Sequence, residues 1–279
     1  MSEEKEMSFL DHLEELRWHI VRAISAIFIF MIVAFLFGPW IFENIVFAPS
    51  RIDFITFQYL CKVGHALNMV ESLCVEIIPF KVQSRFMTGQ FTMHLTASFV
   101  LGFILAFPYV FWEIWRFVTP GLQSSERKNS KWAVTSVTFL FLVGISFGYF
   151  IMSPLAVWFL SSYTISSAIS NEFDITSYVS TITALVFGSG LLFQLPVVVY
   201  FLSKIGIVTP RLMRQYRKHA LVGILILGAI ITPPDPLSQS LISLPLYLLY
   251  EISILISAMV VRQRLKENEA QLKADQEEA

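Results

Sequence analysis

Acidic side chains concentrate near the start of the chain, in the segment SFLDHLEELRWHIVR at residues 8–22. A helix drawn at about 100° per residue separates this segment into a polar and an apolar face. The polar face holds Asp11, Glu15, Trp18 and Arg22, with Glu14 at its edge, and the apolar face holds Phe9, Leu13, Leu16 and Ile20. Clustered carboxylates suit a cationic ligand facing the cytosol. The alternative is a solvated face on which Glu14 and Glu15 pair with neighbouring basic residues.

Three further polar residues could do chemistry. Glu126 lies beside Arg127 and Lys128, which alone indicates only a surface ion pair contributing under about 1 kcal/mol. Glu251 and Gln194 lie inside apolar segments, where an ionised carboxylate costs about 2.5–3.5 kcal/mol. Glu251 is therefore either neutral and bonded to a neighbouring backbone, or a group for helix recognition or proton coupling.

The elements that must position these residues are membrane helices. The chain is 55% hydrophobic and 15% charged, against about 25% charged residues in soluble proteins. This composition predicts an all-α integral membrane protein and excludes a soluble enzyme. The net charge of −1 offers no field for nucleic acid.

Charge-free runs predict six transmembrane helices, since a span needs roughly 20 apolar residues. The predicted fifth span holds 15 residues, about 22 Å against a hydrocarbon core of about 30 Å. The fifth and sixth spans are therefore expected to be short and to thin the bilayer locally. The prediction is one domain over residues 1–261, with an interfacial helix at 8–22, spans at about 23–42, 86–112, 132–160, 175–203, 220–234 and 236–261, a periplasmic loop at 43–85, and a charged cytoplasmic tail at 262–279.

Basic residues orient these spans. Of the 20 Lys and Arg residues, 16 fall on one predicted side and four on the other, within the long loop 43–85. Cytoplasmic segments carry the excess of Lys and Arg, so both termini are expected in the cytoplasm. The acidic N-terminus has no features of a cleavable signal peptide. The sequence therefore predicts a multi-pass protein of the inner membrane.

The two cysteines, Cys61 and Cys74, both lie in the predicted outside loop. In an oxidising compartment they could form a disulfide, stabilising the fold by about 3 kcal/mol. Two unpaired thiols in an apolar cap are the alternative. No CxxC or Cys/His spacing indicates a metal, and no catalytic or nucleotide-binding motif is present, so neither enzymatic activity nor a cofactor is expected.

Three segments together resemble the TatC family, the receptor subunits of twin-arginine translocation. They are HLEELR at 12–17, RFVTPGLQSSERK at 116–128 and ITPPDPLSQSLISLPLYLLYEISILIS at 231–257. The resemblance implies a receptor without enzymatic activity that binds the twin-arginine signal peptides of folded proteins. It also implies self-association, contact with membrane lipid and transfer of cargo to single-span TatA- or TatB-type subunits, driven by the proton-motive force.

The resemblance also assigns residues. Glu15 and Glu126 are expected to accept the Arg-Arg pair, because guanidinium forks match carboxylates, with His12, Leu16 and Arg17 shaping the site. Polar residues are expected where partner helices dock: Thr232, Asp235 and Gln239 by similarity, with Gln194 and Glu251 inside the spans. Structural roles are expected for Pro49, Pro120, Gly121, Pro233 and Pro234.

Two features depart from the family pattern. Gln194 stands in FQLP where many members have glutamate, which puts proton coupling at that position in doubt, and the loop holding both cysteines is longer than usual. A secondary transporter for a small solute is the alternative function, motivated by Glu251, Gln194 and the proline-broken spans. Against it, the two halves of the sequence show no internal repeat.

Overall fold

The computed structural model describes residues 9–67, 74, 81–118, 130–166, 168–231 and 236–277. Almost every element is a helix, and the strands that the described residues form are two short ones. The chain divides into two compact units. Unit 1 comprises Met1–Arg51, Pro79–Leu140 and Ser166–Thr183, and unit 2 comprises Ile52–Ile78, Phe141–Ile165 and Ala184–Ala279.

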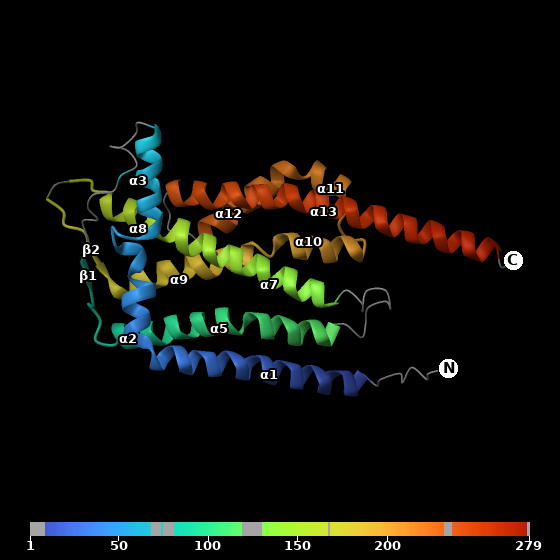
Figure 1. Cartoon of the computed structure of the whole chain (residues 1–279), viewed down its shortest axis with the longest axis horizontal. Helices are drawn as coiled ribbons and strands as arrows, with labels where there is room; N and C mark the ends of the chain where they lie inside the picture. Colours follow the sequence, from blue (N-terminus) through green and yellow to red (C-terminus); the bar gives the residue numbers. More distant parts are fainter. Residues whose placement is uncertain are drawn as a thin grey trace. The chain divides into compact units, whose positions relative to one another are not determined.

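Unit 1 is built on two long helices, α1 (Phe9–Leu36) and α5 (Gly89–Val118), which lie side by side (Figure 1). Small side chains bring their backbones together. Ala23 and Ala106 are buried between them. A Cβ added to Gly102 would lie 2.6 Å from the backbone nitrogen of Met31, closer than real atoms approach. Glycine is therefore required where α1 crosses α5.

The predicted interfacial helix is not separate from the first span, because α1 continues through both without a break. The predicted apolar face of this segment includes Leu13 and Ile20, which no other part of the described chain covers, whereas His19 and Ala23 are buried. The contact between α1 and α5 determines which residues of α1 are buried. Helical periodicity within α1 does not predict this contact, because α5 is distant in sequence.

Beyond α1, unit 1 continues through short helical elements and a small sheet. They are α2 (Gly38–Ile41), the π-helix η1 (Phe42–Val46) and the 3-10 helix η2 (Ala48–Ser50), where Pro49 is fully buried. Strand β1 (Lys81–Gln83) pairs in parallel with β2 (Glu172–Asp174). Strand β1 lies inside the predicted loop 43–85, and β2 lies between the predicted spans 132–160 and 175–203.

Asp174 connects the sheet to the following helix, α9 (Ile175–Leu192). Its carboxylate accepts hydrogen bonds from the backbone N–H groups of Arg85 and Thr176, each at 2.8 Å, and from the Thr176 hydroxyl. The Thr176 hydroxyl and then these N–H donors hold the pKa of Asp174 below its ordinary value. The ionised carboxylate thus ties the start of α9 to the segment after β1.

Unit 2 is organised around the last helix, α13 (Pro236–Glu277). The helices that pack on it are α8 (Ser153–Ser162), α10 (Leu195–Lys204), α11 (Pro210–Gln215) and α12 (Arg217–Ile231). The Ser203 hydroxyl bonds that of Ser257 at 2.8 Å, and the Tyr250 hydroxyl donates to the Met213 carbonyl at 2.8 Å. These bonds satisfy polar groups buried among apolar side chains.

The remaining helices of the described residues are α7 (Ser130–Phe147), followed by the π-helix η4 (Gly148–Met152), and α3 (Ile55–Leu67). Within unit 2, a Cβ on Gly144 or Gly148 would lie 2.7 Å from a carbonyl oxygen of α9. The end of α7 therefore packs closely on α9. Helix α3, which contacts η4, lies within the segment predicted to be an outside loop.

Five helical segments of the described chain are long and apolar enough to cross a membrane. They are Leu13–Leu36, Gly89–Val118, Val134–Ser162, Ile175–Lys204 and Gln239–Lys266. Helix α12, with 15 residues, occupies the predicted fifth span and is shorter than the others. The predicted tail is also partly helical, because α13 continues as far as Glu277.

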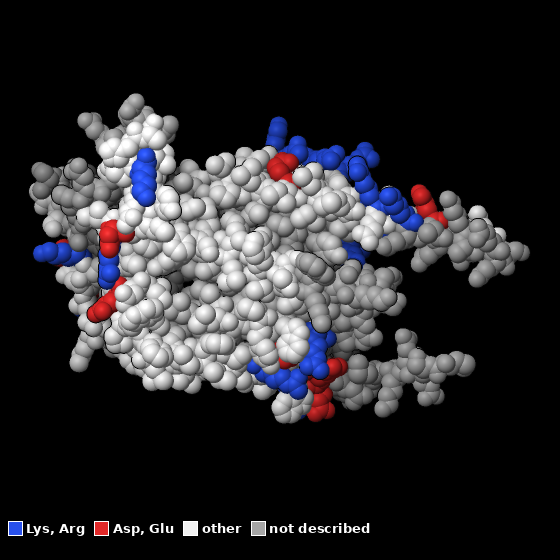
Figure 2. Space-filling view, viewed as in Figure 1, with Lys and Arg blue, Asp and Glu red and all other residues white. Residues whose placement is uncertain are grey.

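Figure 2 shows charged side chains gathered in a few groups, with a broad uncharged surface between them. In unit 1 Glu14, Glu15, Arg17 and Arg22 lie in the first half of α1, and Arg51, Lys81 and Arg85 lie between α1 and α5 in the sequence. In unit 2 basic residues lie within α11 and at the start of α12. Uncharged helix surfaces flanked by charge are typical of membrane-spanning helices.

Candidate functional site

The most deeply buried charged groups of the described chain join α1 to α5. Glu113 of α5 is 1% exposed and His19 of α1 is 5% exposed. Nδ1 of His19 lies 2.5 Å from Oε2 of Glu113, across 94 residues of sequence. A buried carboxylate is costly unless charged or hydrogen-bonded partners surround it. His19 is therefore the principal partner of Glu113.

Two further side chains complete this cluster. The Tyr109 hydroxyl, one helical turn before Glu113, donates a hydrogen bond to the carboxylate. Nη1 of Arg22 lies 3.9 Å from Glu113 Oε2. Glu113 thus faces an imidazole, a phenol and a guanidinium, and together these groups fix the level at which α1 lies against α5.

Beside this cluster is an open pocket of about 400 Å³. Its lining residues are Glu15, Trp18, His19, Arg22 and Arg116. The Glu15 side chain is 42% exposed, and its Oε1 lies 3.9 Å from Nε2 of His19, beyond hydrogen-bond distance. His19 thus stands between two carboxylates, one buried and one open to the pocket.

The arginines at this end of unit 1 already have partners within it. Nη2 of Arg17 lies 3.3 Å from Glu14 Oε1, and Arg22 approaches Glu113. The Arg116 guanidinium lies over the Trp112 ring at 5.7 Å. Glu15 lines the pocket, and its basic contact is His19 at 3.9 Å, which also bonds Glu113 much more closely at 2.5 Å. The Glu15 carboxylate is available to a cation entering the pocket.

The structure describes the side chains of only some residues of the predicted N-terminal site. Glu15 lines the pocket, Leu16 is half-buried beside it in sequence, and exposed Arg17 pairs with Glu14. His12 belongs to α1, but its side chain is not described. The other predicted positions that lie outside the described residues are Pro120, Gly121, Glu126, Thr232, Pro233, Pro234 and Asp235.

The polar residues predicted inside the spans have intramolecular contacts in unit 2. Glu251 Oε2 lies 2.6 Å from Nη2 of Arg217 on α12, and Glu251 Oε1 accepts from the Tyr247 hydroxyl at 3.1 Å. Gln239 donates to the Leu225 carbonyl of α12 at 3.3 Å. Gln194 lies at the N-terminal boundary of α10, just before Pro196. Glu251 and Gln239 thus both connect α13 to α12.

The family model for the Sec-independent protein translocase protein (TatC) matches residues 11–245. This range covers most of the chain, including α1, α5 and the pocket between them. The chain belongs to the TatC family.

Curated TatC proteins match over nearly their whole length. The chain is 38% identical to the TatC protein of Blattabacterium sp. subsp. Periplaneta americana, over 94% of this chain and 99% of the relative. It is 34% identical to TatCy of Bacillus subtilis, over 95% and 94% of the two chains. Crystal structures of the twin-arginine translocase receptor TatC match with TM-scores of 0.67 and 0.68 at 29% and 30% identity. They cover 89% and 88% of this chain and 99% of each receptor chain.

In this TatC-family chain no motif in the sequence predicts His19, Tyr109, Glu113 or Arg116 as site residues. A signal for two of them is nevertheless present in the sequence. His19 shortly precedes the charge-free run that begins at Ala23, and Glu113 directly follows the run 86–112. If consecutive spans are antiparallel neighbours, these two ends lie at one level, so a charged pair there is expected.

Proposed function

We propose that this chain is the receptor subunit of the twin-arginine protein export system in the cell inner membrane. It binds the twin-arginine signal peptides of folded proteins. With small single-span TatA- or TatB-type subunits, it mediates their transport across the membrane at the expense of the proton-motive force. Membership of the TatC family, the family of Sec-independent protein translocase proteins, supports this function.

The observation that supports this proposal most directly is the position of the Glu15 carboxylate at an open pocket. Glu15 lines this pocket, while Glu14 is paired with Arg17 and Glu113 is paired with His19. A guanidinium presents planar N–H donors that match a carboxylate. One arginine of the signal peptide therefore binds Glu15, and Glu126 of the following cytoplasmic segment binds the other.

Glu113 and His19 have a supporting role in this site. His19 lies between Glu113 and Glu15, and Arg22 also approaches Glu113. By engaging both basic side chains, Glu113 keeps them from neutralising Glu15. His12, Leu16 and Arg17 shape the neighbouring surface of the site.

The partner subunits dock on unit 2 near residues 232–235, which connect α12 to α13 in the sequence. Thr232, Asp235 and Gln239 provide the polar contacts, and Gln194 and Glu251 assist from within the spans. The hydrogen bond of Gln239 to α12 is long at 3.3 Å. An incoming helix therefore replaces it at small cost, since hydrogen bonds between membrane helices contribute about 0.6–2 kcal/mol.

The same proposal includes six spans with both termini in the cytoplasm, in one membrane domain over residues 1–261. The short helix α12 is the fifth span, and the bilayer is thinner around it. The excess of basic residues supports the orientation. The Cys61–Cys74 loop then faces the periplasm, where disulfides persist. Buried Pro49 and the prolines 120, 233 and 234 with Gly121 shape the turns between spans.

Site-specific photocrosslinking tests the receptor role. A photoreactive residue at position 18, which lines the same pocket and leaves Glu15 in place, should crosslink in inverted membrane vesicles to a twin-arginine precursor and fail to crosslink when the precursor carries Lys-Lys. With the photoreactive residue at position 18, Glu15→Ala should abolish crosslinking, whereas the matched control Glu14→Ala should retain it. Equal crosslinking of both precursors would overturn the assignment.

Partner docking has a separate test. Gln239→Leu should preserve crosslinking to the precursor while weakening co-purification with the single-span subunits, because the substitution removes a hydrogen-bonding group from α13. Gln263→Leu, in the later part of the same helix, is the control and should leave both properties unchanged. Normal co-purification of the Gln239 variant would contradict the docking assignment.

A further inference from the structure

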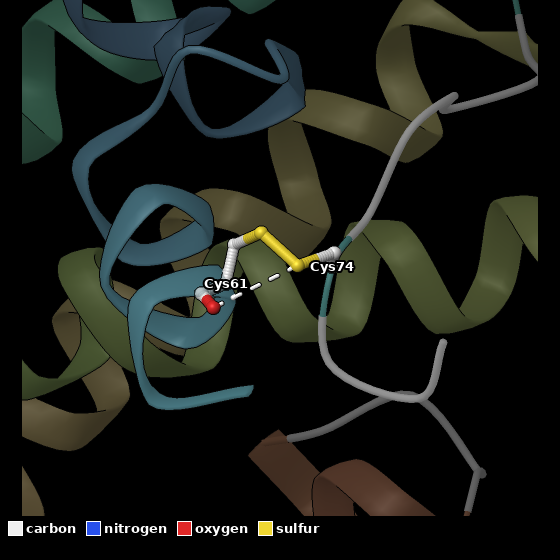
Figure 3. The surroundings of a disulfide bond; sticks show 2 residues. All are labelled: Cys61 and Cys74. Carbon is white, nitrogen blue, oxygen red and sulfur yellow. Dashed lines mark hydrogen bonds between the residues drawn. A yellow bond between two sulfur atoms is a disulfide. The ribbon is translucent and has the colours of Figure 1, made fainter. Parts of the chain in front are cut away.

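Three residues of types that bind metals meet in unit 2, whereas the proposed peptide site belongs to unit 1. Cys61 and His65 lie one turn apart on α3, since four residues separate them. Cys74 is bonded to Cys61 by a disulfide, so its sulfur lies at the same place (Figure 3). The two sulfurs and one ring nitrogen of His65 all lie within 4.8 Å of one another. The spacing of the two cysteines alone does not indicate such a cluster. His65 joins it because His65 and Cys61 lie on the same face of α3.

The spacing of these atoms approaches that of a tetrahedral zinc site. With Zn–S distances of about 2.3 Å and Zn–N distances of about 2.0–2.1 Å, neighbouring ligand atoms lie about 3.4–3.8 Å apart. Opening the disulfide frees both cysteine side chains to rotate by the small amount required. The resulting set of two thiolates and one imidazole is a soft to borderline donor set that suits Zn²⁺.

The cluster is also accessible. Cys61 and Cys74 are half-buried, and His65 is exposed. Cys74 Sγ also lies 3.7 Å from the Cys61 carbonyl oxygen, beside the backbone of α3. Three protein ligands leave one coordination position open to water, as in zinc sites with an exchangeable ligand.

We propose that reduction of the Cys61–Cys74 disulfide converts this cluster into a Zn²⁺ site with His65 as the third ligand. A dithiol donor transfers two electrons and two protons to the disulfide, forming two cysteine thiols while its own two sulfurs become a disulfide. Zn²⁺ then binds as the two thiols lose their protons. The disulfide and the metal exclude each other, so the site reports the redox state of this loop. This inference is independent of the peptide-binding function.

Zinc uptake by the purified full chain in detergent tests the proposal. After reduction with a phosphine and removal of free metal, the chain should retain about one Zn²⁺, whereas the oxidised chain should retain none. Co²⁺ used as a spectroscopic probe should give thiolate-to-metal charge-transfer absorption only in the reduced chain. No zinc in the reduced chain, or equal zinc in both forms, would overturn the proposal.

Variants separate the site from adventitious binding. His65→Ala leaves the disulfide possible but should weaken Zn²⁺ affinity by at least about 10-fold, because even outer-shell partners of a ligand contribute that much. The control is His219→Ala, an exposed histidine of α12 outside the cluster. It should bind as the parent does. Unchanged affinity in the His65 variant would refute the assignment of the third ligand.

A second readout does not depend on metal counting. Zn²⁺ should slow alkylation of Cys61 and Cys74 in the reduced chain, and His65→Ala should remove much of this protection. Circular dichroism of the reduced chain establishes that its helices persist during the assay. Equal alkylation rates with and without Zn²⁺ in a folded, reduced chain would contradict the proposal.

Discussion

In each unit the described residues include an acid–base pair that joins two helices, and the surroundings of these two pairs differ. The Glu113–His19 pair joins α5 to α1 with side chains that are 2% and 6% exposed. The Glu251–Arg217 pair joins α13 to α12 with side chains that are 32% and 47% exposed. Both pairs have short contacts, at 2.5 and 2.6 Å. Distance therefore does not distinguish them, but burial does.

The comparison shows that equal geometry does not imply equal stabilisation. When one partner of an exposed pair is removed, water or lipid headgroups solvate the other. The Glu113 carboxylate has no such replacement, because it is enclosed by α1 and α5. The buried pair is thus a requirement of the fold around the pocket, whereas the exposed pair is a modest link between helices.

Loss of His19 should have the largest effect. His19→Ala leaves Glu113 buried without its principal partner and should destabilise the protein by about 3–5 kcal/mol. Thermal unfolding in detergent at neutral pH measures this loss.

A double variant isolates its cause. Replacing His19 and Glu113 together by leucine removes the buried charge and should recover most of the stability, as often happens when buried ion pairs are replaced by apolar residues. If the double variant were less stable than His19→Ala, the cost would come from lost packing rather than from the uncompensated charge.

The close approach of α1 to α5 gives the next largest effect. Gly102→Ala places a methyl group against the backbone of Met31 and should cost about 1–3 kcal/mol, typical of overpacking. The control is Gly223→Ala in α12, where an added Cβ meets nothing within 4 Å. A lower unfolding temperature is expected only for the first variant, and equal temperatures would show that the helices separate easily.

The exposed pair should contribute less. Glu251→Gln retains the shape of the side chain and its contact with Tyr247 while removing the charge facing Arg217. The expected loss is smaller than that of His19→Ala, because the Arg217 guanidinium at the start of α12 can turn to water or lipid headgroups. Thermal unfolding in detergent measures it. A loss comparable to that of His19→Ala would invalidate the distinction drawn from burial.

Asp174 should give the smallest effect, visible as a pH dependence. Its pKa is lowered, first by the Thr176 hydroxyl and then by backbone N–H donors, so the folded chain favours the ionised form. This contribution is complete above the ordinary pKa of 3.8 and is lost as the pH falls through the lowered value. The stability difference between the parent and Asp174→Asn should therefore shrink in acid. A difference constant with pH would exclude the carboxylate as its source.

The sequence predicts the membrane character, the approximate positions of most long helices and Glu15 as a site residue. Each depends on composition or local periodicity, or on a short motif. The Glu113–His19 pair and the burial of His19 depend on the contact between α1 and α5, which periodicity within one helix does not encode. Cys61 and His65 share a face only because the outside loop forms α3, which the loop prediction did not include.

The position of α13 in the chain has a consequence for biosynthesis. Helices α8, α10, α11 and α12 all pack on this helix, yet its 42 residues are synthesised after all four of them. At about 5–20 residues per second, α13 takes about 2–8 s to complete after α12 has been made. During this interval α8 and α10 lie in the membrane without the surface on which they pack. Assembly of unit 2 therefore waits for α13 and does not proceed helix by helix.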